Sequence, residues 1–206
     1  MKFTVLTDFN QSSIIRHACA VEAGYVNNPA DTGGETNHGI TAATAAEFKA
    51  SLVTKFSWDG TMRNLSEEMA MYIYQVGWWD RLHCSELLAV HPFIADRIFD
   101  FGVNAGRGAA ATNLQRILNV MNRMQQDYKD ISTQGGIGPE TLGALKAYVS
   151  KRGTVGVLNL IQLLIDLQGA HYVQVSEKRE LNETFMTGWT TRVREANQTY
   201  QAVLQR

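Results

Sequence analysis

A predicted helix end and the polar loop after it each carry a carboxylate, and the pair could perform acid–base chemistry. Glu22 stands at the C-terminal end of an otherwise apolar helix face expected over about residues 9–23. The helix dipole places partial negative charge at that end, and together with partial burial it predicts a raised pKa for Glu22. A carboxylic acid that stays protonated near neutral pH can protonate the leaving oxygen of a glycoside.

The second carboxylate, Asp31, follows in a loop rich in glycine and polar residues, where wetter surroundings should keep it ionised. Thr36 offers a hydroxyl further along that could orient a water molecule. Two carboxylates in unlike environments can divide the acid and base roles at a glycosidic bond. Two simpler interpretations stay open: Glu22 as a solvated helix-terminal residue, and Asp31 as the cap of a Pro-x-Asp-x-Gly-Gly turn. Glu35, beside Thr36, is the rival to Asp31.

Other catalytic chemistries find little support in the sequence. The 5 histidines and 2 cysteines do not show the spacing of a zinc site. Cys19 falls on the apolar face of the first predicted helix, where a free cysteine is usually a packing residue. Neither a Gly-x-Ser-x-Gly elbow nor a phosphate-binding loop occurs. We therefore predict no metal and no cofactor.

The elements that must position these residues are mostly helices. Apolar residues recur at helical spacing and predict seven to nine helices, interrupted by a short β-hairpin or irregular loop over residues 24–41. Capping residues mark several helix starts, namely a Thr44–Glu47 capping box, Ser66, Pro92 and Gly138-Pro139. The predicted fold class is mainly α.

The residues around the two carboxylates resemble the signature of a known family. The segment from Glu22 to Thr41 contains Glu-Ala-Gly-Tyr, then Pro-Ala-Asp-Thr-Gly-Gly-Glu-Thr-Asn-His-Gly-Ile-Thr. It resembles glycoside hydrolase family 108, bacterial and phage N-acetylmuramidases whose signature has Glu-Gly-Gly-Tyr and Pro-x-Asp-x-Gly-Gly-x-Thr-Asn-x-Gly-Ile-Thr. Ala23 and His38 depart from that pattern. The Glu–Asp–Thr spacing also resembles the phage-lysozyme triad, one residue shorter before Thr36.

Later motifs resemble the family's companion peptidoglycan-binding segment. They are Phe99–Gly106, Leu114-Gln115, Gly136–Leu142 and the closing Phe185-x-x-Gly-Trp-x-x-Arg-Val. The resemblance implies a lysozyme-like catalytic half over residues 1–92 and a helical peptidoglycan-binding half over residues 93–206, packed together as one compact unit.

The resemblance also implies an activity, hydrolysis of the β-1,4 bond between N-acetylmuramic acid and N-acetylglucosamine. Glu22 would be the general acid, and Asp31 would hold or activate water or stabilise positive charge on the sugar. Thr36 would orient that water. A lytic transglycosylase and a non-catalytic wall-binding or secretion-associated protein are the alternatives, and the presence of all three residues favours the hydrolase.

Four further residues are candidates for substrate binding. Tyr25 would form a cleft wall against a sugar ring or else pack under the loop. Asn27 and Asn37 could donate to N-acetyl or hydroxyl groups, although asparagine in such loops also stabilises turns. Asn104 would face the cleft or cap the following helix.

The distribution of charge bears on partners and location. The net charge of −1 argues against nucleic acid, but residues 1–90 carry −4 and residues 91–206 carry +3. The basic half could meet the anionic bacterial wall.

The N-terminus does not look like a signal peptide, and stable membrane insertion is not expected. We therefore expect synthesis in the bacterial cytoplasm and action on the wall, reached through a phage holin, lysis or a secretion machine. An endolysin, bacteriolytic and antimicrobial, is the first expectation, and a secreted antibacterial effector is the second.

Overall fold

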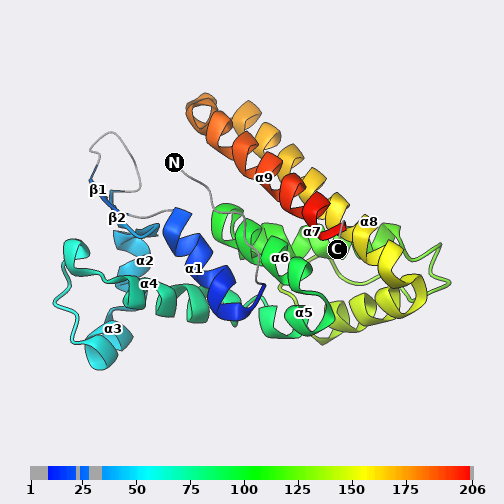
Figure 1. Cartoon of the computed structure of the whole chain (residues 1–206), viewed down its shortest axis with the longest axis horizontal. Helices are drawn as coiled ribbons and strands as arrows, with labels where there is room; N and C mark the ends of the chain where they lie inside the picture. The colour runs from blue at the N-terminus through cyan, green and yellow to red at the C-terminus, as the bar shows by residue number, and fades with distance from the viewer. Residues whose placement is uncertain (1–8, 22–23, 28–33, 205–206) are drawn as a thin grey trace. The chain divides into compact units, whose positions relative to one another are not determined.

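The computed structural model describes residues 9–21, 24–27 and 34–204, most of them helical (Figure 1). They form two compact units, a first unit that ends at Asp80 and a second unit that begins at Arg81. A small antiparallel sheet follows the first helix. This arrangement confirms the predicted mainly α, lysozyme-like fold class with a short β element after the first helix. The break between the units comes earlier than residue 92, where the resemblance placed the end of the catalytic half, and that division stays a prediction.

The first unit is built from short elements. They are α1 (Gln11–Val21), β1 (Tyr25–Asn27), β2 (Glu35–Asn37), β3 (Ile40–Thr41), α2 (Ala42–Glu47), α3 (Lys49–Phe56), the 3-10 helix η1 (Met62–Asn64), α4 (Glu67–Tyr74) and the π-helix η2 (Gln75–Trp79). Helix α1 packs on α4, and Ile14, Ile15 and Cys19 of α1 are buried. Burial raises the pKa of the Cys19 thiol to about 12.

Helix starts in this unit show how local hydrogen bonds set the boundaries. Ser66 caps α4, because its hydroxyl accepts from the Met69 backbone N–H, and the predicted start there is confirmed. The capping box expected at Thr44 is wrong. Thr41 caps α2 instead, and the backbone N–H of Thr44 donates to its hydroxyl. The two-residue turn of His38 and Gly39, both with positive φ, joins β2 to β3. Because β3 is only two residues long, it ends at Thr41 and the helix begins directly after it.

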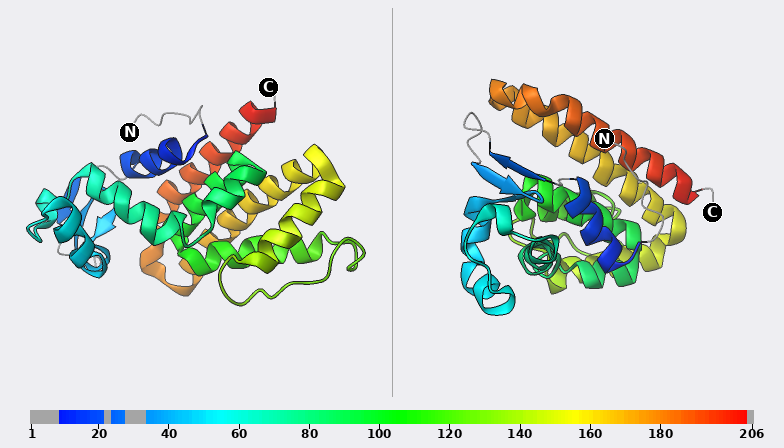
Figure 2. Two further views of the ribbon diagram at one scale, coloured as in Figure 1. Left: turned by 90° about the horizontal axis from the view of Figure 1, so that it is seen from below. Right: turned by 60° about the vertical axis from the view of Figure 1, so that its left-hand side comes forward.

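The second unit contains longer helices. They are α5 (Cys84–Val90), α6 (Pro92–Ala105), α7 (Arg107–Val120), α8 (Pro139–Lys178), the 3-10 helix η3 (Glu180–Phe185) and α9 (Met186–Leu204). Pro92 and Pro139 both stand in the first turn of their helices, as predicted. Gly153 has non-helical dihedrals and kinks α8. Figure 2 shows the two segments of α8 running in different directions, with α9 alongside the second segment.

Helix α8 is long and apolar enough, by length and composition alone, to cross a membrane. Its second segment nevertheless buries Leu160, Ile161, Leu164 and Ile165 inside the unit. These residues pack against neighbouring helices of the unit, and 39% of the apolar window is buried there.

A network of buried and half-buried charges joins three helices of the second unit. Arg97 of α6 pairs with Asp96 at 2.6 Å and with Asp100 at 3.5 Å. Asp100 also pairs with Arg192 of α9 at 2.9 Å and accepts a hydrogen bond from Gln168 of α8 at 3.0 Å. The Phe-Asp-Phe-Gly motif and the closing Gly-Trp-x-x-Arg motif thus meet directly through Asp100 and Arg192.

Candidate active site

Two of the predicted catalytic residues, Glu22 and Asp31, lie outside the described residues. In the sequence, Glu22 directly follows Val21, the last residue of α1, and Asp31 falls between β1 and β2. Their catalytic roles stay predictions. The described part of the site is the three-stranded sheet, with the side chains that surround it.

The register of the sheet divides the predicted site residues between its two faces. Tyr25 pairs with Asn37 and Asn27 pairs with Glu35, whereas Val26 pairs with Thr36, which in turn pairs with Thr41. Side chains alternate along a strand, and directly opposed residues share a face. Tyr25, Asn27, Glu35 and Asn37 therefore project from one face, and Thr36 projects from the other. Thr36 and the predicted sugar contacts of the sheet are not brought to the same surface.

A cluster of three side chains occupies the Tyr25 face. The Tyr25 hydroxyl donates a 2.7 Å hydrogen bond to Glu35, and the Arg63 guanidinium lies 4.1 Å from the centre of the Tyr25 ring. The bond to the Glu35 carboxylate raises the pKa of Tyr25. Arg63 covers one face of the ring, so a sugar could stack only on the other. The role of Tyr25 as a cleft wall stays a prediction, with the uncovered face of its ring as the surface that would contact a sugar.

Asn37 serves the internal structure of the first unit. Its side chain is only 5% exposed, and its amide nitrogen donates to the carbonyl oxygens of Met62 at 2.9 Å and of Leu65 at 3.1 Å. An amide nitrogen has two hydrogens, so neither is left to donate to a sugar. The predicted substrate contact of Asn37 is thereby restricted to its carbonyl oxygen. Asn27, at the end of β1, is exposed and accessible to a ligand.

Asn104 lies near the end of α6, in the second unit. Helix α7 begins after Gly106 without a side-chain cap, so Asn104 does not cap it. The Oδ1 atom of Asn104 is buried and finds no hydrogen-bond partner among the described residues. A buried acceptor without a donor costs about 1–3 kcal/mol. Substrate binding by Asn104 stays a prediction.

Sequence reasoning missed Arg63, which is 38 positions from Tyr25 in the chain. No local pattern links the two residues, because the loop that returns the chain to the sheet sets their contact.

A separate pocket of the first unit, of about 460 Å³, was also not predicted from the sequence. Its lining contains none of the predicted site residues and includes one carboxylate, that of Glu68; the full set is Gln11, Ser12, Ile15, Phe56, Glu68, Met71, Tyr72 and Gln75.

Comparisons with known proteins agree with this fold. The structure is similar to that of SagA from Brucella abortus, with a TM-score of 0.67 and 24% sequence identity over 93% of this chain and 94% of that one. Residues 15–106 match the family glycosyl hydrolase 108, and residues 109–194 match a predicted peptidoglycan domain. No curated protein matches the chain.

The fold is therefore that of a mainly α, lysozyme-like protein with two functional regions. Residues 15–106 belong to the glycosyl hydrolase 108 family, and residues 109–194 form the companion peptidoglycan-binding segment. The later motifs, from Leu114-Gln115 onward, fall in that segment as predicted, whereas Phe99–Gly106 falls within the hydrolase match instead. The chain is a peptidoglycan hydrolase of the glycosidase class. The hydrolase match runs past the break between the two units and includes α6 with Asn104.

Proposed function

We propose that the chain is an N-acetylmuramidase, which hydrolyses the β-1,4 bond between N-acetylmuramic acid and N-acetylglucosamine. The observation that carries this proposal is the glycosyl hydrolase 108 match over residues 15–106, which spans Glu22, Asp31 and Thr36. These residues supply two carboxylates and a hydroxyl, the groups that glycoside hydrolysis by acid and base requires.

In the proposed reaction Glu22 protonates the glycosidic oxygen as the bond to the leaving sugar breaks. Asp31 holds or activates the attacking water, or stabilises the positive charge that develops on the sugar ring. Thr36 orients that water with its hydroxyl. Because Thr36 and Glu35 project from opposite faces of the sheet, only one of them can serve the reacting bond. We assign the role at the glycosidic bond to Thr36.

The biological role that follows is that of an endolysin, which degrades the cell wall and so lyses bacteria. The chain would be made in the bacterial cytoplasm and reach its substrate through a phage holin or a secretion machine. Lysis of cells from outside would make it antimicrobial.

The products of digestion test the bond specificity. Purified protein is incubated with insoluble peptidoglycan, and the soluble fragments are identified by mass spectrometry before and after borohydride reduction. Fragments ending in reducing N-acetylmuramic acid support the proposal. Reducing N-acetylglucosamine would indicate the other glycosidic bond, and 1,6-anhydro-muramic acid would indicate a lytic transglycosylase, which closes the ring without adding water. Either result would overturn it.

A further inference from the structure

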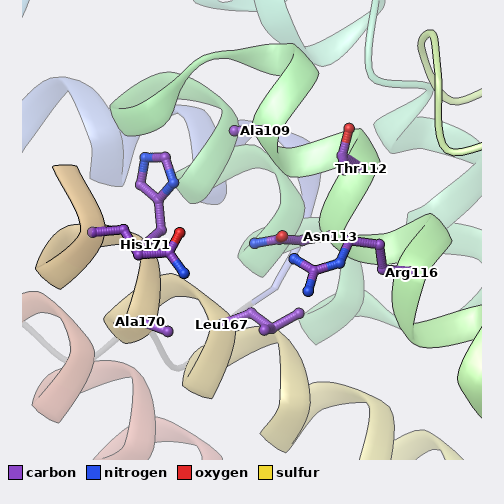
Figure 3. A pocket seen from close by; sticks show the side chains of 8 residues that line it. Ala109, Thr112, Asn113, Arg116, Leu167, Ala170 and His171 are labelled. Atoms are coloured by element: carbon purple, nitrogen blue, oxygen red, sulfur yellow. The ribbon is translucent and has the colours of Figure 1, made fainter. Parts of the chain in front are cut away.

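A polar pocket in the second unit is lined by none of the predicted site residues. It has a volume of about 250 Å³ and lies between α7 and the second segment of α8 (Figure 3). Its lining consists of Ala109, Thr112, Asn113 and Arg116 from α7 and of Leu167, Ala170, His171 and Gln174 from α8. All eight residues fall within the peptidoglycan-binding segment, residues 109–194.

Asn113 is the first indication that this pocket takes a ligand. Its side chain is only 8% exposed and makes no hydrogen bond to any residue that the structure describes. Figure 3 shows it pointing from α7 into the pocket, toward α8. The residue is mostly buried, but its amide oxygen and nitrogen are open to the space of the pocket, where a ligand could pair with them.

Arg116 is the second indication. Its side chain is exposed, and it forms no ion pair within the described part of the chain. In Figure 3 its guanidinium lies beside Asn113, at the pocket. None of the eight lining residues is acidic. The positive charge is therefore available to an anion from outside, and a guanidinium binds a carboxylate through two parallel hydrogen bonds.

His171 and the apolar lining complete the pocket. The His171 ring packs edge-on against Phe101, with 5.1 Å between the ring centres, so its orientation is fixed. Burial and the charge of Lys178 lower the pKa of His171, which leaves a neutral ring that can donate at one nitrogen and accept at the other. Ala109, Leu167 and Ala170 supply an aliphatic wall that suits methyl groups rather than a charged surface.

We propose that this pocket binds the free carboxylate end of a peptidoglycan stem peptide. Arg116 holds the carboxylate, Asn113 pairs with the adjacent peptide group, and the methyl groups of alanine contact Leu167. A volume of about 250 Å³ is below the roughly 300–1,000 Å³ of pockets for drug-sized ligands, which favours a chain end over an extended glycan. An uncharged amino sugar would leave the Arg116 charge unmatched. The assignment rests on peptidoglycan as the substrate of the proposed function.

A small soluble probe tests this pocket in the full-length protein. N-acetyl-D-alanyl-D-alanine is titrated into the chain, and binding is followed by calorimetry and by NMR shifts. Its C-terminal amide and inorganic phosphate are titrated in parallel. We expect saturable binding of the free acid and at least tenfold weaker binding of the amide and of phosphate, because only the dipeptide acid supplies both the charge and the peptide group.

Three variants connect that binding to the named residues. Arg116→Gln should weaken binding of the free acid roughly tenfold or more, as expected for the loss of a charge-assisted hydrogen bond. Ala170→Trp adds bulk at an exposed position of the lining and should block the pocket without removing a polar group. Arg194→Gln, an exposed position on α9 outside the lining, is the matched control and should bind as wild type does. Circular dichroism confirms that each variant is folded.

The outcomes separate this inference from the catalytic proposal, because the probe contains no glycosidic bond. Wild-type protein that hydrolyses peptidoglycan but does not bind the dipeptide would overturn the pocket assignment alone. Dipeptide binding without muramidase products would overturn the catalytic proposal alone. Equal binding of the amide or of phosphate, or unchanged binding by Arg116→Gln and Ala170→Trp, would also overturn the assignment.

Discussion

At the scale of single residues, the proposed chemistry depends first on the proton of Glu22. Glu22→Gln keeps the shape of the side chain and removes the acid, so we expect hydrolysis of peptidoglycan to fall by about 10²–10⁴-fold, the usual contribution of general acid catalysis. Release of reducing sugar from purified walls measures the effect, and thermal unfolding checks that the fold is intact. Near-normal turnover in the folded variant would exclude Glu22 as the general acid.

The second carboxylate can be assigned by comparing two matched amide substitutions. Asp31→Asn should lower hydrolysis strongly while leaving cosedimentation with insoluble peptidoglycan intact, because the proposed role depends on charge. Glu35→Gln should have a smaller effect, since Glu35 already accepts the hydrogen bond of Tyr25 and projects away from Thr36. The reverse pattern, an active Asp31→Asn and an inactive Glu35→Gln, would move the reaction to the other face of the sheet.

At the scale of elements, the first turn of α6 contains a pH-sensitive cap. The Phe93 backbone N–H donates to Nδ1 of His91 at 3.2 Å, which requires that nitrogen to be unprotonated. Burial lowers the pKa of His91, so the unfolded chain takes up the proton more readily than the folded one does. The contribution of His91 to the free energy of unfolding is complete above about pH 6.5, the ordinary pKa of histidine in an unfolded chain. It is lost as the pH falls from there through the lower pKa that His91 has in the folded protein.

His91→Asn tests this cap, because an asparagine oxygen accepts the same hydrogen bond without titrating. The variant should lose part of the decline in stability that wild type shows between about pH 7 and pH 5. Urea unfolding across that range measures the difference. The pKa of His171 is also lowered by burial, so a residual slope of the same sign is expected in both proteins. Identical slopes would show that His91 contributes nothing to it.

The elements also show which features local sequence can predict. The starts at Ser66, Pro92 and Pro139 were predictable because each depends on one residue and the backbone next to it. Thr41 and Thr44 have the same chemistry, and only the position of the His38-Gly39 turn decides between them. Glu35 and Thr36 project in opposite directions because side chains alternate along a strand. This could be predicted as soon as the residues were assigned to a strand. The contact of Arg63 with Tyr25 depends on the tertiary fold.

At the scale of the whole molecule, residues 1–90 carry −4 and residues 91–206 carry +3. This charge difference predicts that binding to the cell wall depends on salt concentration. Lys129 and Lys151, both exposed, can be reversed together to glutamate; Arg152 is less suitable because it pairs with Asp127 at 2.8 Å. The double variant should cosediment less with peptidoglycan at low salt. The difference should disappear as salt rises, since exposed charges are screened beyond about 10 Å at 0.1 M.

Reversal of Lys49 and Lys55, exposed on α3 of the first unit, is the matched control for that experiment. It changes the net charge by the same amount and should weaken cosedimentation less. Equal loss in the two double variants would indicate that net charge alone matters, and no loss in either would show that the uneven distribution has no role in wall binding.

The burial of both cysteines has a consequence for redox chemistry. Neither Cys19 nor Cys84 forms a disulfide and both are buried, and a thiol reacts with oxidants mainly as the thiolate. With a pKa of about 12, only about one Cys19 in 10⁵ is ionised at pH 7. The described fold contains no disulfide, and burial shields both thiols from oxidants in solution. Transfer from a reducing to an oxidising medium should therefore leave these two cysteines as thiols.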